Sequence, residues 1–345
     1  MQTATPIQIQ GTPKNIGLTL GELAREAMHE WIIHTDEWAC LMEWYGSSII
    51  ARLIDTAQKA FPTYCDELCG ISTGLGMEFE KVFIWNCRSE LLGISPLRSS
   101  TLAWNRLGSR SVCHCLSGIG SYEGAARLAM IHPDGRPGFV TVYVPGQLPG
   151  NTIAASMSGI VHAVNCLDFQ PALDGVLTGF ISRAVLDTRS LLEAIELVME
   201  WNHFGAAHHV LGSASEFVMV SIETQGENRS IVPVASKYAH TNHPTHANLK
   251  SVIHNHNVES EARLEEMRRL LDRIPSHPDE TCIDQTPSTE AQCQRLGATT
   301  ISGDMGRATN AVVSLVTTGA ENIRFSVRSP QESTWLTHTF PVSLR

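Results

Sequence analysis

The sequence lacks the features that mark several large classes of protein. Its 345 residues carry 25 Lys and Arg against 35 Asp and Glu, a formal charge of −10, without the basic clusters that bind nucleic acid. No apolar run approaches the roughly 20 residues of a membrane-spanning helix. Met1 to Pro6 have neither the basic nor the apolar region of a signal peptide. We therefore expect a globular, cytoplasmic protein without nucleic-acid or membrane partners.

Metal and nucleotide motifs are also missing. There is no P-loop, no G-x-G-x-x-G turn and no His-Glu-x-x-His. The chain has 15 histidines, but His208-His209, His254-Asn255-His256 and Cys113-His114-Cys115 each lack the matching second half that a zinc site needs. Nine cysteines, an odd number, predict mostly free, buried thiols rather than a disulfide framework. We expect no metal and no cofactor.

The first ninety residues show helical periodicity. Thr19-Leu20-Gly21-Glu22 has the form of a capping box, and an amphipathic stretch follows from Leu20 to about Tyr45. A second helix is predicted from Ser47 to about Lys59, and shorter ones over 64–72 and 80–86. Gly70, Gly74 and Gly76 are interpreted as a loop between helices.

From about residue 100 the pattern changes to short strands mixed with helices. Strands are predicted at 139–144, 159–164, 217–223, 230–235, 311–317 and 323–327. Helices are predicted at 180–186, at 190–201 after the capping box Ser190-Leu191-Leu192-Glu193, and at 260–273. Residues 275–306 are predicted to form a long loop. Grouped strands separated by paired helices favour an α+β layered fold over a regular βαβ alternation.

Five stretches, in order, resemble one enzyme family. Asn86-Cys87-Arg88-Ser89-Glu90 is similar to its Asn-Ala-Arg-Thr-Glu, and Ser99-Ser100-Thr101-Leu102-Ala103 stands where it has Gly-Cys-Thr-Thr-Ala. Ser158 to Asn165 resembles its Ser-Ala-Gly strand, Gly205 to His209 stands at its Ala/Ser-rich loop, and His240-Thr241-Asn242-His243 matches its His-Thr-Asn-His. Over roughly residues 15 to 330, the chain resembles the acyl-coenzyme A:isopenicillin N acyltransferase family of N-terminal-nucleophile (Ntn) hydrolases.

The resemblance implies an αββα sandwich: two stacked antiparallel sheets between helical layers, with a helical N-terminal segment. Residues 1–345 would form a single domain, with 1–99 as the helical part and 100–345 as the part that carries the nucleophile. In this family the precursor cuts itself just before the nucleophile, which here implies cleavage between Ser99 and Ser100. The two parts would then remain one folded unit.

The resemblance also implies roles for individual residues. Ser100 is the expected nucleophile, its freed α-amine the general base, and the Asn242 amide the oxyanion donor. An α-amine titrates near ~7.7–8.0, so it is substantially neutral at working pH. His114, Cys113 and Cys115 are expected beside the catalytic centre, and Thr101, Asn165, His208 and His243 are expected to contact substrate. The substrates would be a small-molecule thioester or amide as acyl donor and an amine as acceptor, with the enzyme acting as a monomer or a homo-oligomer.

Two departures from the family pattern leave alternatives open. Ser100 stands where the family has Cys, which leaves three alternatives. Ser100 is a natural nucleophile, or it replaces a Cys nucleophile, or the alignment is shifted and Cys113 or Cys115 is the nucleophile. The family's Gly-Gln-Asn-Trp-Asp falls on Ser111-Val112-Cys113-His114-Cys115, which lacks the Asp. Two rival hypotheses remain: an amidohydrolase of the same fold that uses water as acceptor, and a catalytically degenerate protein that binds a ligand without turnover.

Overall fold

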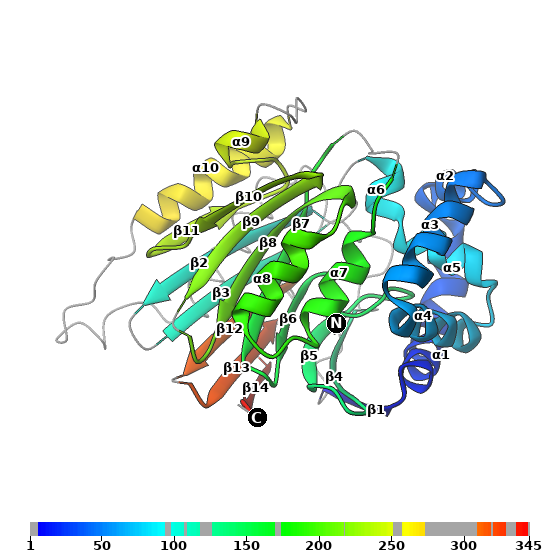
Figure 1. Cartoon of the computed structure of the whole chain (residues 1–345), viewed down its shortest axis with the longest axis horizontal. Coiled ribbons are helices and arrows are strands. Elements are labelled where there is room, and N and C mark those ends of the chain that lie inside the picture. Colours follow the sequence, from blue (N-terminus) through cyan, green and yellow to red (C-terminus); the bar gives the residue numbers. More distant parts are fainter. Residues whose placement is uncertain are drawn as a thin grey trace.

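Two stacked β-sheets form the centre of the chain, as seen in a computed structural model (Figure 1). The structure describes residues 6–93, 98–106, 109–117, 126–169, 174–216, 218–250, 257–272, 309–318, 320–328 and 336–343. The predicted loop over 275–306 lies outside these residues.

Eight strands form the first sheet, in the order β1-β4-β5-β6-β7-β8-β9-β10. Their bounds are β1 Ile7–Gly11, β4 Arg127–Pro133, β5 Phe139–Tyr143, β6 Ile153–Ser156, β7 Ile160–Cys166, β8 His203–Ser213, β9 Met219–Gly226 and β10 Asn228–Pro233. Neighbouring strands run antiparallel except β1 and β4, which are parallel. Gly205 to His209 therefore lie within strand β8, so their expected placement in a loop is wrong.

Six strands form the second sheet, in the order β11-β2-β3-β12-β13-β14, and all of its neighbours are antiparallel. Their bounds are β2 Arg98–Arg106, β3 Ser109–Ser117, β11 Lys237–His240, β12 Thr309–Thr318, β13 Asn322–Arg328 and β14 Leu336–Pro341. The predicted strands at 311–317 and 323–327 correspond to β12 and β13.

An apolar layer joins the two sheets. Alternate side chains of the second sheet, such as Ala103, Val112 and Leu116, pack against Val161 and Val210 of the first sheet. Because side chains of a strand alternate between its two faces, the intervening residues of the second sheet face away from the first. Those outward residues, among them Leu102 and Trp104, pack against helix α10, Val258–Asp272.

Helices cover the outer face of the eight-stranded sheet (Figure 1). Helices α7 Thr178–Val185, α8 Leu191–Glu200 and α6 Arg88–Leu92 contact strand β8 of this sheet, and α1 Pro13–Glu30 contacts β1 and β4. The other N-terminal helices pack against α1, α6 and one another beside the sheet (Figure 1); they are η1 Ile32–His34, α2 Asp36–Met42, α3 Ser48–Ala60, α4 Pro62–Leu75 and α5 Phe79–Asn86. Helix α9 Ala247–Lys250 lies beside β9 and β10. The order helix, sheet, sheet, helix confirms the expected α+β layered sandwich. Among the described residues, no helix has the length and apolar character needed to span a bilayer.

The predicted helix from Leu20 to Tyr45 is divided and begins earlier than expected. Helix α1 starts after Thr12, whose hydroxyl accepts a hydrogen bond from Asn15 N, so the true cap precedes Thr19 by two turns. Thr19 lies inside α1, where its hydroxyl donates to Asn15 O. Ser190 is confirmed as the N-cap of α8, because its Oγ accepts from Glu193 N, while the Glu193 carboxylate accepts from Arg189 N, one residue before the cap.

Gly70 and Gly74 do not form a loop; they lie inside helix α4. A Cβ atom at either position would collide with the backbone of α1, and a Cβ at Gly17 or Gly21 of α1 would collide with that of α4. Glycine is therefore required here by the close approach of the two helices, and this gain offsets its low helix propensity. The string Gly70-Ile71-Ser72-Thr73-Gly74 has the G-x-S-x-G form, but it is helical and not the strand-to-helix turn of a hydrolase elbow.

We predict that Gly17→Ala destabilises the protein, because the new methyl group overlaps Glu67 O and forces α1 and α4 apart. Overpacking of this kind costs typically about 1–3 kcal/mol. A urea titration would show a lower midpoint at an unchanged slope. Gly179→Ala in α7 is the matched control, since the nearest atom to its new Cβ is Asn151 Nδ2 at 3.8 Å. Equal midpoints for the two variants would contradict the close-packing explanation.

Candidate active site

The start of strand β2 places two adjacent serines on opposite faces of the sheet. Ser99 and Thr101 point toward the first sheet, where both bond to Asn165 of β7. Ser100 points the other way, toward α10, where its Oγ accepts a hydrogen bond from Arg263 Nη1 at 2.8 Å. The two-residue period of a strand makes this separation unavoidable.

Ser99 lies between two asparagine amides. Its Oγ accepts from Asn165 Nδ2 at 2.8 Å and from Asn242 Nδ2 at 3.5 Å. Its own backbone N–H donates to Asn242 Oδ1 at 3.2 Å. Asn242 follows the end of β11, which pairs with β2 as far as His240 opposite Thr101. Both the hydroxyl and the backbone nitrogen of Ser99 therefore contact the same amide group.

Asn165 is the centre of a buried hydrogen-bond network. Its Oδ1 accepts from the Thr101 hydroxyl at 2.8 Å and from His208 Nδ1 at 3.0 Å, which leaves Nδ2 for Ser99. Since an amide oxygen can only accept, His208 carries its proton on Nδ1. The predicted contact residues Thr101, Asn165 and His208 are thus brought together, and Asn165 links the other two to Ser99.

His114 joins the same network from strand β3. Its Nδ1 lies 2.8 Å from Thr101 Oγ1. Because the Thr101 proton is directed to Asn165, His114 Nδ1 is the donor and His114 Nε2 carries no proton. Burial lowers the pKa of His114 to about 3, so the ring is neutral at ordinary pH. His114 therefore holds Thr101 in place, and it is linked to Ser99 through Thr101 and Asn165.

The two cysteines expected beside the catalytic centre lie on the face of the sheet that carries Ser100. Cys115 is opposite Ser100 and Cys113 opposite Leu102 in the β2–β3 pairing, and both pack in the apolar cluster under α10. Cys113 is disulfide-bonded, so its sulfur is not a free thiol. Both side chains lie on the face of the sheet that carries Ser100, opposite to the face from which Ser99 and Thr101 bond to Asn165.

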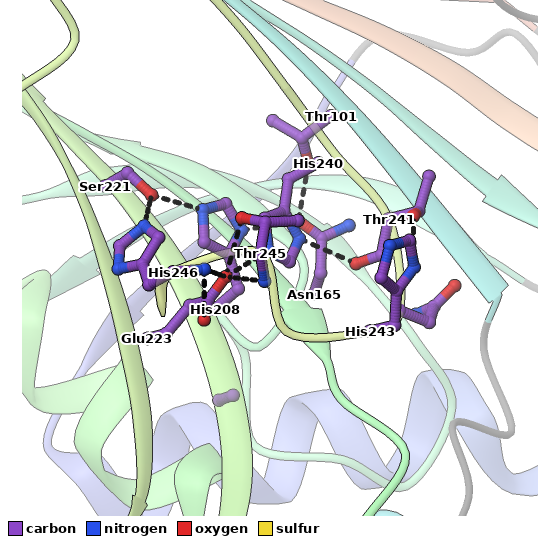
Figure 2. A network of polar contacts seen from close by, with 12 residues as sticks. Thr101, Asn165, His208, Ser221, Glu223, His240, Thr241, His243, Thr245 and His246 are labelled. Atoms are coloured by element: carbon purple, nitrogen blue, oxygen red, sulfur yellow. Dashed lines mark hydrogen bonds and ion pairs between the residues drawn. The ribbon is translucent and has the colours of Figure 1, made fainter. Parts of the chain in front are cut away.

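The His240-Thr241-Asn242-His243 stretch is held by buried polar contacts (Figure 2). His240 Nε2 lies 2.8 Å from Glu223 Oε1 of β9, and its ring stacks on His208 with centroids 3.5 Å apart. His243 Nδ1 lies 2.8 Å from Ser260 Oγ of α10, which also accepts from Asn242 N at 2.8 Å. His240 and His243 thus anchor the chain on both sides of Asn242, and the Ser260 hydroxyl links His243 to the Asn242 N–H.

Glu223 is a fully buried carboxylate on which this segment depends. Its oxygens accept from Thr245 N, Thr245 Oγ1 and His246 N besides facing His240. Burial by itself would raise the pKa of Glu223, but hydrogen bonding and electrostatic attraction from His240, with the Thr245 N–H, lower it to about 2. Glu223 is thus ionised and ties β9 to the 240–246 segment.

Sequence reasoning missed three residues of this site. Glu223 and Arg263 contact it from distant parts of the chain, and no local pattern indicates either. The sequence resemblance assigns Ser99 only to the cleavage bond, although the alternation of side chains along a strand places Ser99 on the same face as Thr101. Among the residues that the structure describes, no group of three or more His, Cys, Asp or Glu could hold a metal ion.

The layered α+β fold is consistent with that of an Ntn hydrolase, and its candidate site is the Ser99 hydroxyl between two amides at the start of β2. Residues 123–295, half of the chain, match the family described as acyl-coenzyme A:6-aminopenicillanic acid acyl-transferase. The chain belongs to this family. The matched range contains Asn165, His208, Asn242 and Arg263 and begins after β2, so it includes neither Ser99 nor Ser100.

One curated relative is similar to this chain. It is a beta-alanyl-dopamine/carcinine hydrolase from Drosophila melanogaster, 22% identical over 228 aligned residues. The match covers 58% of this chain and 58% of the relative, so the chain spans well under two thirds of that protein's length.

We predict that Glu223→Gln lowers the free energy of unfolding at neutral pH and makes it vary less as the pH falls. The Glu223 pKa of about 2 lies below the roughly 4.3 of an unfolded glutamate, so its contribution is present above that value and is lost as pH falls toward 2. The shift corresponds to about 3 kcal/mol. Melting temperatures between pH 7 and pH 2 should converge for variant and wild type at the acid end. The exposed Glu196→Gln of α8 is the control, and a constant gap for Glu223→Gln would refute the prediction.

Proposed function

We propose that this protein is an Ntn-type acyl-transfer enzyme whose nucleophile is Ser99, in place of the Ser100 expected from sequence alignment. The observation that supports this choice is the placement of the Ser99 hydroxyl between Asn165 Nδ2 and Asn242 Nδ2. An acyl-transfer site needs amide donors beside the nucleophile, because negative charge develops on the substrate oxygen as the hydroxyl attacks. The contacts of Ser100 are instead with Arg263 on the opposite face.

The proposed maturation step cuts the bond between Arg98 and Ser99. Ser99 Oγ attacks the carbonyl carbon of Arg98, and its proton passes to Ser99 N as the peptide bond breaks. Water then hydrolyses the resulting ester, which restores the hydroxyl and leaves a carboxylate on Arg98. The freed α-amine remains beside Asn242 Oδ1, the present acceptor of the Ser99 N–H.

In the proposed catalytic cycle the α-amine of Ser99 takes the hydroxyl proton as Oγ attacks the substrate carbonyl. Asn165 and Asn242 donate to the developing oxyanion. The protonated amine then gives its proton to the leaving group, a thiol or an amine, as the acyl-enzyme forms. Attack by an amine on the acyl-enzyme completes a transfer, and attack by water completes a hydrolysis.

Hydrolysis of a small amide is a second candidate function. It is favoured by the similarity to a relative that is named a beta-alanyl-dopamine/carcinine hydrolase. Both candidates share the acyl-enzyme on Ser99 and differ only in the acceptor. Product analysis with an amine present in excess would separate them, since a transferase yields a new amide and a hydrolase yields only the free acid.

We expect Ser99→Ala to abolish acylation and cleavage, because it removes the attacking oxygen while leaving both amides in place. Loss of a nucleophile of this kind costs on the order of 10³-fold or more in kcat/KM. Ser100→Ala is the matched variant and should still form the adduct, with at most about a 10-fold loss. Intact-mass measurement after incubation with a panel of thioesters and amides detects both cleavage of the chain and the acyl adduct. Ser99→Cys is included because a thiol is a stronger nucleophile than a hydroxyl.

Two outcomes would contradict the proposal. If Ser100→Ala loses the adduct and Ser99→Ala keeps it, the nucleophile is Ser100. If wild type and Ser99→Cys both remain full-length and take up no acyl group from any member of the panel, the protein is a ligand-binding member of its family without turnover.

A further inference from the structure

A buried arginine on α10 contacts the acyl-transfer site from the outer side of the sheet. Arg263 is 3% exposed. Its Nη2 donates to Asn242 Oδ1 at 2.7 Å, and its Nη1 donates to Ser99 O at 3.1 Å and to Ser100 Oγ at 2.8 Å. The guanidinium thus bridges the backbone of the nucleophile strand and the side chain of the oxyanion donor.

The contact with Asn242 matters because the oxygen and the NH₂ group of an asparagine amide are nearly equal in shape, so shape alone does not fix which way the amide is turned. Turned one way, Asn242 presents Nδ2 to Ser99 Oγ and to Cys166 O, its acceptor at 2.9 Å. Turned the other way, it would present an oxygen there and an NH₂ group to the guanidinium. A guanidinium has only donors, so the second arrangement would bury two donors against each other without an acceptor.

Arg263 keeps this preference at the oxygen end of the amide throughout the reaction, as Cys166 O does at the nitrogen end. In the uncut chain the Ser99 N–H also donates to Asn242 Oδ1. After cleavage that nitrogen becomes a neutral amine with a lone pair, which can accept as well as donate and no longer specifies an oxygen as its neighbour. An arginine keeps its proton at every working pH, so the guanidinium still donates to an oxygen of Asn242 after cleavage.

The position of Arg263 is itself fixed from two sides. Nη1 is held by Ser99 O and Ser100 Oγ, and Nε lies 3.6 Å from Glu259 Oε1, one turn earlier on α10. Apolar neighbours on the same helix, Leu264 and Met267, pack under the sheet beside it. The Ser100 hydroxyl, which lies on the opposite face of β2 from the Ser99 hydroxyl, therefore has a structural role: it accepts a hydrogen bond that helps to hold Arg263.

We propose that Arg263 is a positioning residue of the acyl-transfer site, which holds the Asn242 amide with its nitrogen toward Ser99 Oγ. This inference rests on the proposed function, since it assigns Arg263 a role through Asn242. Arg263 contacts Ser99 at the backbone carbonyl oxygen, whereas the attacking Oγ faces the first sheet. Arg263 thereby keeps the Asn242 NH₂ group turned toward the oxyanion position before the substrate binds.

A double-mutant cycle between Arg263 and Asn242 tests the proposal. Asn242→Ala should lower kcat about 10²–10³-fold, as expected for removal of one oxyanion donor. Arg263→Met should lower kcat about 10- to 10²-fold with little change in KM, because Asn242 Oδ1 loses the charged donor that fixes it and the amide is then oriented from its nitrogen end by Cys166 O. Arg263→Lys, which keeps the charge but not the planar fork, should recover part of that loss.

The decisive comparison is the double variant. If Arg263 acts through Asn242, adding Arg263→Met to Asn242→Ala causes no further loss of kcat, since there is no amide left to orient. A purely structural role would make the two losses multiply. Arg269→Met, on the exposed side of α10, is the control that should leave kcat unchanged. If Arg263→Met fails to fold, as judged by circular dichroism, the same cycle is run with Arg263→Lys.

Failure of this inference and failure of the proposed function give different results. Multiplicative losses in a protein that does form an acyl adduct on Ser99 would overturn the role of Arg263 alone. Absence of the adduct from both wild type and Ser99→Cys would overturn the proposed function, and the role of Arg263 with it.

Discussion

The alternation of side chains along β2 is the constraint on which the site depends. Ser99 and Thr101 face the first sheet because consecutive residues of a strand must point to opposite sides. The same rule sends Ser100 under α10 to Arg263. A shift of one residue in the pairing of β2 with β11 would exchange these roles, so the register from Lys237 opposite Trp104 to His240 opposite Thr101 sets which hydroxyl meets the amides.

A buried polar network between two sheets is stable only if its members find partners. Here Thr101, His208 and Ser99 each bond to Asn165, and Glu223 accepts from the N–H groups of Thr245 and His246. These contacts rigidify the two amides that face Ser99. Preorganised donors of this kind stabilise developing charge without rearranging during the reaction, which fits a site whose chemistry is acyl transfer.

Local patterns predicted much of the fold but less of the site. The layered α+β class and strands such as 139–144 followed from periodicity, and the His240-Thr241-Asn242-His243 match identified Asn242. The glycine error arose because the deciding contact is distant in sequence: Gly70 and Gly74 suit a loop until α1 is packed against them. The error at Thr19 is local, since Thr12, which caps α1 through Asn15, stands in the same part of the chain. Arg263 carries no sequence signal, since its partners lie some 20 to 160 positions away.

The most direct test of the central claim is to locate the acyl group by fragment mass spectrometry. The protein is incubated with a thioester, quenched in acid and digested, and the peptide that contains Ser99 and Ser100 is sequenced. The account predicts a cut before Ser99 and the added mass on Ser99, with Ser100 unmodified. An acyl group on Ser100, or a chain that begins at Ser100, would contradict it.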